Sequence, residues 1–218
     1  RESYSIKVDE TLLSSLEPGE AILCLNYDGL YGINNINRFL QESNPNPAIT
    51  WDIQQYKVGD PILFLDSDRF RPIIHNNMKG IIHGAKIIDE GTMEERIQLD
   101  IEIPKLVFER DIQDLDLELL ENNDRRNKSL VRFYVNKIKS ADEDGEDFRT
   151  TVPFQVAYAV SIHKAQGLEY DSVKIVITDE VEELVTHNVF YTAITRAREK
   201  LKIYWTPETE EKVISRIK

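Results

Sequence analysis

The chain has 218 residues, 41% of them apolar, and its 39 acidic and 27 basic side chains give a formal net charge of -12 at pH 7. It is long and apolar enough to bury the core of one or two domains, which argues against disorder of the whole chain. The acidic excess excludes a globally basic protein of the kind that binds nucleic acid through its overall charge.

Cysteine and histidine are scarce. Cys24 is the single cysteine, so the chain has no internal disulfide framework, and with only four histidines we expect no metal site. No run approaches 18 uncharged apolar residues, so we expect no membrane span. The sequence begins R-E-S-Y-S-I-K-V-D-E, without an initiator methionine or the apolar region of a signal peptide. We therefore expect a cytoplasmic protein and a fragment of a longer chain.

The first 50 residues predict half of an α/β unit. The apolar run at 21–25 follows a Pro-Gly turn and predicts a buried strand. Helical spacing then predicts an amphipathic helix with Asp28 as its N-cap and residues 44–47, Asn-Pro-Asn-Pro, at its end. The apolar positions of that helix are Leu30, Ile33, Ile36, Phe39 and Leu40.

The middle of the chain is β-rich and acidic. Residues 97–103 alternate strictly between apolar and polar side chains, which is typical of an antiparallel strand with one buried face. Similar short segments predict a small antiparallel module, with a short helix at 115–120; these segments are 58–66, 79–88, 97–104 and 129–135. The acidic runs at 111–121 and 142–147 most often form a solvated face or an exposed turn.

The α/β pattern returns after residue 150. We expect strands at 154–162, 173–178 and 201–205, a connection at 163–168, and helices at 188–200 and 207–217. Thr186 or Asn188 is the expected cap of the first of these helices. The architecture predicted is one α/β domain, residues 1–50 and 151–218, interrupted by a β-rich insertion at 51–150.

The acidic excess is smallest in the last segment of the chain. Net charges are -4 for residues 1–50, -7 for residues 51–150 and -1 for residues 151–218. A local basic groove in the final third is therefore compatible with the global charge.

The segment S-I-H-K-A-Q-G-L-E, residues 161–169, follows a predicted buried strand. Ligands of α/β folds bind where the chain leaves the carboxyl ends of parallel strands, and Ser, His, Lys and Gln all donate hydrogen bonds suited to phosphate oxygens. Gly167 allows close backbone approach or a positive φ. The composition also fits an ordinary polar connection with His163 satisfied locally.

The segment Y-T-A-I-T-R-A-R, residues 191–198, carries two arginines near a predicted helix C-terminus. Both fit surface charges favoured by the helix dipole. Arg196, flanked by Thr195, equally fits a cleft in which a planar guanidinium would meet a transferring phosphoryl group. Periodicity alone leaves both interpretations open.

Together these two segments resemble the last two motifs of superfamily 1 DNA helicases. S-I-H-K-A-Q-G-L-E-Y-D-S-V resembles motif V, and V-F-Y-T-A-I-T-R-A-R-E-K-L resembles motif VI, in the form most like the RecD-like branch of the UvrD/RecD-like group. A-I-L-C-L-N with N-R-F-L-Q-E resembles motif IV. V-G-D-P-I-L-F-L-D with H-N-N-M-K-G-I-I resembles the start of a β-barrel insertion.

The resemblance implies an α/β fold: a RecA-like second helicase lobe, with a parallel sheet and flanking helices, interrupted by a small antiparallel β-barrel-like insertion. It also implies a nucleotide site shared between two lobes. Arg196 would be the arginine finger that reaches the γ-phosphate, and Gln166 would couple the two motifs. Gly167 and Glu169 would approach the nucleotide, with Glu169 directed towards the ribose.

The same resemblance implies contacts to single-stranded DNA. Ser161, His163 and Lys164 would lie near the strand's backbone, and Asn26 would be a weaker member of the same track. UvrD-like relatives carry a further arginine in motif IV, but residues 30–33 here read L-Y-G-I and leave that contact in doubt.

No part of the sequence matches the phosphate-binding loop G-x-x-x-x-G-K-[ST]. ATP with Mg²⁺ would therefore be bound mainly by an absent N-terminal RecA-like lobe, which is the expected partner together with single-stranded DNA. The fragment itself is expected to be monomeric and inactive, and the parent protein to act in DNA repair or recombination. The alternatives are a non-catalytic nucleic-acid-binding module and a protein-interaction module, each derived from a helicase lobe.

Overall fold

The computed structural model describes residue 12, residues 19–137 and residues 151–217. It divides into two compact units, which we describe separately. The parallel-sheet unit comprises Arg1–Ser43 with Tyr158–Lys218, and the inserted unit comprises Asn44–Ala157. The sequence places the corresponding boundaries at 50–51 and 150–151.

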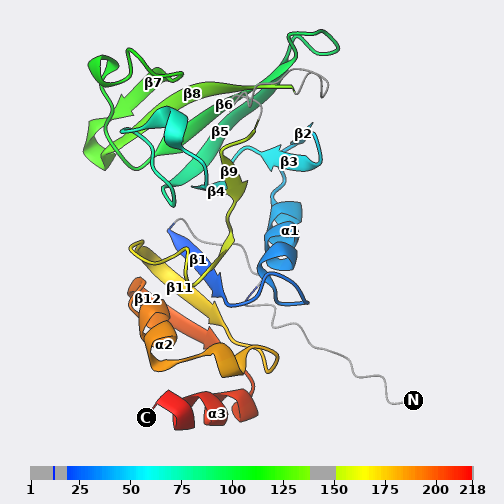
Figure 1. Ribbon diagram of the computed structural model, residues 1–218, viewed down its shortest axis with the longest axis vertical. Coiled ribbons are helices and arrows are strands. Elements are labelled where there is room, and N and C mark those ends of the chain that lie inside the picture. Colours follow the sequence, from blue (N-terminus) through cyan, green and yellow to red (C-terminus); the bar gives the residue numbers. More distant parts are fainter. Residues whose placement is uncertain (1–11, 13–18, 138–150, 218) are drawn as a thin grey trace. The chain divides into compact units, whose positions relative to one another are not determined.

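The parallel-sheet unit is built on four strands in the order β10-β1-β11-β12, and every neighbouring pair runs parallel (Figure 1). Three α-helices belong to the described residues of this unit. The strands are β1 (Glu20–Cys24), β10 (Ala159–Ser161), β11 (Tyr170–Val176) and β12 (Ala197–Tyr204), and the helices are α1 (Ile33–Ser43), α2 (His187–Ile194) and α3 (Pro207–Ile217). This arrangement confirms the predicted α/β class.

The centre of this sheet is β1, which hydrogen-bonds to β10 on one side and to β11 on the other. Its last four residues are buried, and Cys24 packs with Ile22 and with Ile33 and Ile36 of α1. Burial raises the pKa of the Cys24 thiol to about 12, because the thiolate would lose its hydration there. Cys24 is therefore a packing residue and a poor nucleophile at neutral pH.

A buried ion pair joins β1 to β11. Lys174 Nζ lies 3.1 Å from Glu20 Oε2, and their side chains are only 10% and 9% exposed. The hydroxyl of Ser172 donates a second hydrogen bond to Glu20, at 2.9 Å. Removing either charge would leave the other buried without its counterion, which is the costly way to disrupt such a pair.

The inserted unit is a six-stranded antiparallel sheet in the order β7-β8-β6-β5-β4-β9, with a separate hairpin, β2–β3. The alternation predicted for residues 97–103 is confirmed, because the apolar side chains of β6 are buried and the polar ones face outward. The strands are β2 (Ala48–Trp51), β3 (Gln54–Lys57), β4 (Pro61–Phe64), β5 (Lys79–Ile88), β6 (Arg96–Ile103), β7 (Glu118–Asn123), β8 (Lys128–Asn136) and β9 (Phe154–Val156).

Phe133 is the centre of an aromatic group in the core of the inserted unit. Phe133 contacts Phe64, Phe70 and Phe154 at centroid distances of 6.4, 4.8 and 6.3 Å. On the outer face Arg132 donates two hydrogen bonds to Asp100, at 2.6 and 2.8 Å. The Asp100 carboxylate raises the pKa of Arg132 further above its already high value.

Several sequence expectations are wrong in detail. The single strand expected at 154–162 is two strands: β9 belongs to the antiparallel sheet and β10 to the parallel one. The helix expected at 188–200 ends at Ile194, because Ala197–Tyr204 pairs with β11 instead. The short helix expected at 115–120 is absent, since Glu118–Asn123 forms strand β7 against β8.

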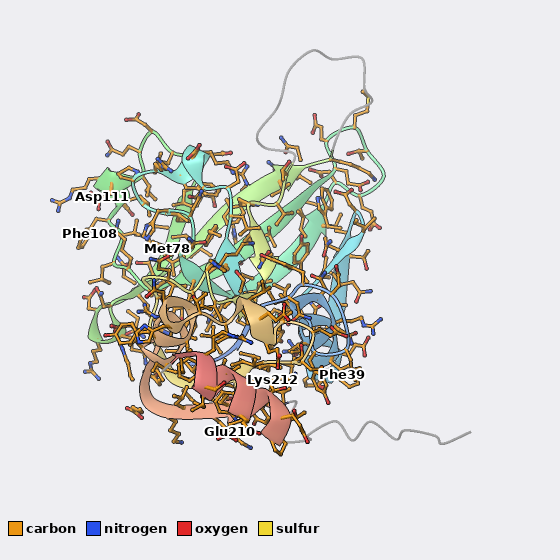
Figure 2. The ribbon with its side chains drawn as sticks, turned by 60° about the horizontal axis from the view of Figure 1, so that its bottom comes forward. Phe39, Met78, Phe108, Asp111, Glu210 and Lys212 are labelled. Atoms are coloured by element: carbon orange, nitrogen blue, oxygen red, sulfur yellow. The ribbon has the colours of Figure 1, made fainter. Side chains whose placement is uncertain are left out.

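The first helix also differs from expectation. It begins at Ile33, and Asp28 does not cap it but accepts a hydrogen bond from the Asn34 side chain at 3.2 Å. Leu30 and Phe39, expected on the apolar stripe, are 44% and 46% exposed. Phe39 is labelled in Figure 2. The hairpin β2–β3 was not anticipated, and the acidic run at 142–147 lies outside the described residues.

Candidate functional site at the edges of the parallel sheet

The parallel sheet has two chemically distinct edges. Its carboxyl edge is where the strands end: Ser161, the last residue of β10, pairs with Cys24, the last residue of β1. Its amino edge is where the strands begin: Tyr170, the first residue of β11, pairs with Ala197, the first residue of β12. The turn 162–169 runs from the carboxyl edge of β10 to the amino edge of β11, and so it connects the two edges.

Arg196 lies at the amino edge, between the end of α2 and the start of β12. Its Nε donates to the carbonyl oxygen of Thr192 at 2.9 Å, and its Nη1 donates to the carbonyl oxygen of Leu168 at 2.9 Å. Its Nη2 donates to the Thr195 hydroxyl at 3.1 Å. The guanidinium is therefore half-buried between a helix C-terminus, which favours a cation, and the end of the turn that carries Gly167.

Glu169 also lies at the amino edge, where its exposed carboxylate is paired with Arg198. Arg198 donates from Nε at 2.9 Å, and its Nη2 lies 2.7 Å from the same Glu169 oxygen. The hydrogen bond to Glu169 raises the pKa of Arg198. Arg198 was expected on a helix end; it lies on β12, and its pairing with Glu169 was missed because it depends on the β11–β12 register.

Tyr170, the first residue of β11, is hydrogen-bonded to the main chain of Arg196. Its backbone N–H donates to the carbonyl oxygen of Arg196 at 2.9 Å, which fixes the main chain on either side of the guanidinium. Burial raises the pKa of the Tyr170 phenol to about 12, against a smaller lowering by the Arg196 charge. The phenol therefore stays neutral at physiological pH.

The turn after β10 is anchored by the last residue of that strand, and its Gly167 end is exposed. The buried Ser161 accepts a hydrogen bond at Oγ from the Lys164 N–H at 3.2 Å. Gly167 has φ +83°, and a Cβ added there would meet no atom within 4 Å, so glycine serves the backbone conformation and not close packing. Gln166 and His163 are exposed on the same turn.

The carboxyl edge brings the remaining predicted residues together. Lys164 Nζ lies 5.8 Å from the centroid of the Tyr27 ring. Tyr27 directly follows Asn26, which lies two residues beyond the end of β1. The Asn26 side chain donates to the carbonyl oxygen of Asp28 at 2.6 Å. Ser161, Lys164 and Asn26 thus lie on neighbouring strand ends, while the expected nucleotide contacts Arg196 and Glu169 lie at the opposite edge.

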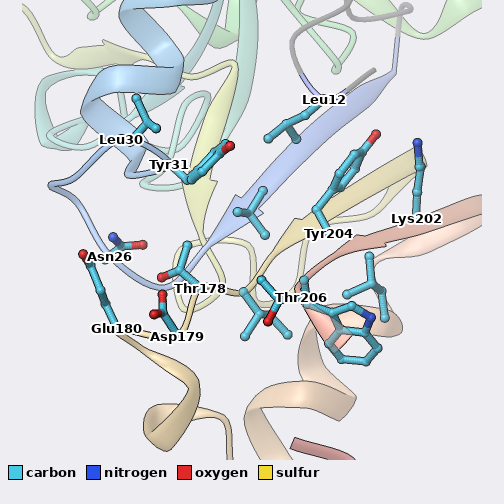
Figure 3. Close-up of a pocket in the computed structure, with 14 residues that line it drawn as sticks. Leu12, Asn26, Leu30, Tyr31, Thr178, Asp179, Glu180, Lys202, Tyr204 and Thr206 are labelled. Atoms are coloured by element: carbon cyan, nitrogen blue, oxygen red, sulfur yellow. The ribbon is translucent and has the colours of Figure 1, made fainter. Parts of the chain in front are cut away.

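A cavity of about 530 Å³ opens at the carboxyl ends of β1, β11 and β12 (Figure 3). Asn26, Thr178, Asp179 and Glu180 lie together at one end of it. The Thr178 hydroxyl is buried there with no hydrogen-bond partner among the described residues. The sequence did not predict this cavity, because it forms only where three strand ends and the residues after them meet.

The charges at the carboxyl edge are of both signs. Asp179 and Glu180 line the cavity beyond β11, whereas Lys164 and His163 follow β10 on the other side of β1. In residues 19–137 and 151–217, no three His, Cys, Asp or Glu side chains are grouped so that they could hold a metal ion. Of the helices in these ranges, none combines the length and apolar character that a membrane crossing requires.

The part of the chain that carries the two motifs is similar to known helicase domains. Residues 156–204 match the UvrD-like helicase C-terminal domain. The RecBCD enzyme subunit RecD from Buchnera aphidicola subsp. Schizaphis graminum is 21% identical over 192 residues, covering 86% of this chain and 25% of that protein. The ATP-dependent DNA helicase Pif1 from Campylobacter jejuni is 25% identical over 216 residues, covering 93% of this chain and 46% of that protein.

Solved structures of Pif1 helicases are also similar to this chain. The enzyme from Candida albicans aligns with a TM-score of 0.49 and 13% identity, covering 88% of this chain and 48% of that one. The resemblance to superfamily 1 helicases is confirmed by the family match and the relatives. The chain spans about a quarter to a half of the length of these relatives.

Proposed function

We propose that this chain is the C-terminal motor lobe of an ATP-dependent DNA helicase or translocase, with Arg196 as its arginine finger. The observation that carries the proposal is the position of Arg196 at the amino edge, where it is hydrogen-bonded to Leu168, the residue before Glu169 of the Glu169–Arg198 pair. Motif V and motif VI thus meet at one place, as a nucleotide site supplied by both requires. The match of residues 156–204 to a helicase domain supports this assignment.

The chemistry of the amino edge suits phosphoryl transfer. A guanidinium brought against the γ-phosphate stabilises the charge that spreads over its oxygens in the transition state, a contribution of roughly three to five decades in rate. Glu169 is an acceptor for ribose hydroxyls once it is released from Arg198. Gln166 and Gly167 lie on the turn between the two edges and would transmit the state of one edge to the other.

The described residues around Arg196 do not form a site for the Mg²⁺ ion that accompanies ATP. The carboxylates next to Arg196 are Glu169 and Asp171, and both face Arg198, at 2.7 and 4.0 Å. An edge that offers a fixed arginine but no metal site complements a nucleotide that is already held, with its metal, by another lobe. We propose that this other lobe is the N-terminal RecA-like lobe of the same parent protein.

The carboxyl edge suits the backbone of single-stranded DNA. Ser161, His163, Lys164 and Asn26 offer donors that hold phosphates without reading sequence. Asp179 and Glu180 would repel phosphates from the β11 side, so the strand would run over the ends of β10 and β1. We propose a parent helicase that acts in DNA repair or recombination in the cytoplasm.

The decisive experiment replaces Arg196 in the full-length parent protein. Arg196→Ala should lower DNA-stimulated ATP hydrolysis by about three decades or more, while single-strand affinity persists, because the two edges are separate. Arg125→Ala, an exposed arginine of the inserted unit, is the matched control. Unchanged turnover in Arg196→Ala would reject the motor lobe and favour a non-catalytic binding module. Mg²⁺-dependent hydrolysis by the 218-residue chain alone would reject the need for a second lobe.

A further inference from the structure

The Thr195 side chain lies between the end of α2 and the Arg196 guanidinium. Its Oγ1 is 2.8 Å from the Tyr191 carbonyl oxygen and 3.2 Å from that of Thr192, so its one proton is donated to the last turn of the helix. The same oxygen accepts a hydrogen bond from Arg196 Nη2 at 3.1 Å. The hydroxyl thus connects the rigid helix end to one terminal nitrogen of the arginine.

Three acceptors together fix the guanidinium plane. Thr192 O holds Nε, Leu168 O holds Nη1 and Thr195 Oγ1 holds Nη2, so all three nitrogens are engaged. A guanidinium has five N–H groups. Two of them, one on each terminal nitrogen, therefore make no hydrogen bond within the described residues. A pair of N–H groups in fixed orientation is the donor set that recognises two oxygens of a phosphoryl group.

Thr195 supplies the only side-chain acceptor among these three, since the other two are backbone carbonyls. A long flexible arginine loses rotamer freedom when it reaches a fixed geometry. A neighbouring residue that holds the arginine side chain before the reaction lowers this entropy loss in the transition state. Small misplacements of a reacting group there reduce the rate strongly.

We propose that Thr195 is a positioning residue: its hydroxyl pre-orients Arg196 so that two guanidinium N–H groups are presented to the γ-phosphoryl group. This inference rests on the proposed function, because it assumes that Arg196 meets the nucleotide. Thr195 itself need not touch ATP. Its contribution should appear in the chemical step and depend entirely on the presence of Arg196.

The test compares three single variants in the full-length parent protein under saturating single-stranded DNA. Thr195→Val, which keeps the shape but loses the hydroxyl, should lower kcat for ATP about tenfold, with KM for ATP changed less than twofold. Thr195→Ser, which restores the hydroxyl, should return kcat to within about twofold of the parent value. Thr50→Val, the same change at an exposed position of β2, should leave kcat and KM unchanged. If Thr195→Val fails to fold by circular dichroism, Thr195→Ala takes its place.

A double-mutant cycle separates positioning from a purely structural role. In an Arg196→Ala background, Thr195→Val should lower kcat no further, because the residue it positions is gone. A second tenfold loss in that background, or failure of Thr195→Ser to recover kcat, would overturn the inference. If Arg196→Ala alone leaves turnover intact, the proposed function fails. If Arg196→Ala is inactive while Thr195→Val turns over normally, only the positioning role fails.

Discussion

At the amino edge of the parallel sheet, each arginine is held by partners from another segment of the chain: Arg196 by Leu168 and Arg198 by Glu169. At the carboxyl edge, His163 is exposed, and Lys164 Nζ lies over a neighbouring aromatic ring. The difference fits the two roles that we propose for these edges. A group that meets a transition state needs fixed geometry, whereas a track for a moving strand needs charge and donors that release it easily. Parallel strands separate these demands, because all of them begin at one edge and end at the other.

The largest expected effect comes from breaking the buried ion pair that joins β1 to β11 beneath both edges. Lys174→Ala should lower the free energy of unfolding by about 3–5 kcal/mol, because Glu20 would remain buried without its counterion. Denaturant unfolding of the 218-residue chain measures the change. Lys86→Ala, at an exposed position of β5, should stay within about 0.5 kcal/mol of the parent chain. A loss below about 1 kcal/mol for Lys174→Ala would mean that the pair is not needed to join β1 to β11.

The carboxyl edge is tested by charge reversal. Lys164→Glu in the full-length protein should weaken single-stranded DNA binding about tenfold at low salt, while kcat at saturating DNA stays near the parent value. The slope of log affinity against log salt should become shallower by about 0.7 for each phosphate that the variant no longer neutralises. Fluorescence anisotropy over a salt series measures both quantities, with Lys86→Glu as the control. An unchanged slope would remove Lys164 from the proposed track.

The turn that joins the edges is tested at Gly167. Gly167→Ala should cost about 1 kcal/mol of stability, because its φ of +83° strains any residue with a Cβ. Gly91→Ala in the inserted unit is a matched control, since its φ is +76° and its Cβ would also meet nothing within 4 Å. Both variants should lose similar stability, but only Gly167→Ala should slow ATP turnover in the full-length protein. Equal turnover in the two variants would reject a coupling role for the turn.

The smallest effect is expected at the exposed Glu169–Arg198 pair. Arg198→Ala should leave the unfolding midpoint unchanged, because solvent screens a pair of this exposure. Release of Glu169 should lower KM for ATP by roughly twofold, and it should leave KM for 2′,3′-dideoxy-ATP unaltered. Steady-state kinetics with both nucleotides measures the difference. A matching fall in both KM values would show that Glu169 does not contact the ribose.

The sequence predicts best where one local pattern decides the structure. The alternation at 97–103 identifies β6 and its buried face, because neighbouring side chains on a strand point to opposite sides. The helix beginning near residue 188 is predicted at its start, where Thr186 accepts a hydrogen bond from the Val189 N–H. The end of this helix is not predicted, because residues 197–200 suit a helix locally but pair with β11 in the folded sheet.

The candidate site is predictable as a set of residues but not as an arrangement. Motif resemblance selects Arg196, Glu169 and Lys164, whereas their separation onto two edges follows from the strand order β10-β1-β11-β12. The Glu169–Arg198 pair and the Thr195 hydrogen bond depend on register and on where α2 ends. An apolar run such as 154–162 likewise gives no sign that the chain passes from one sheet to the other within it.

The position of β1 at the centre of the parallel sheet has a consequence for the order of folding. Ile22 pairs with Ala159 and with Lys174, so neither neighbouring strand exists until the whole inserted unit has been synthesised. The inserted unit closes mainly through strands that are near one another in sequence, such as β5 with β6 and β6 with β8. The inserted unit can therefore fold first during synthesis, while β1 still lacks both of its neighbouring strands. The parallel-sheet unit, to which we assign the motor role, is therefore completed last, and until then the apolar residues of β1 have no neighbouring strand to cover them.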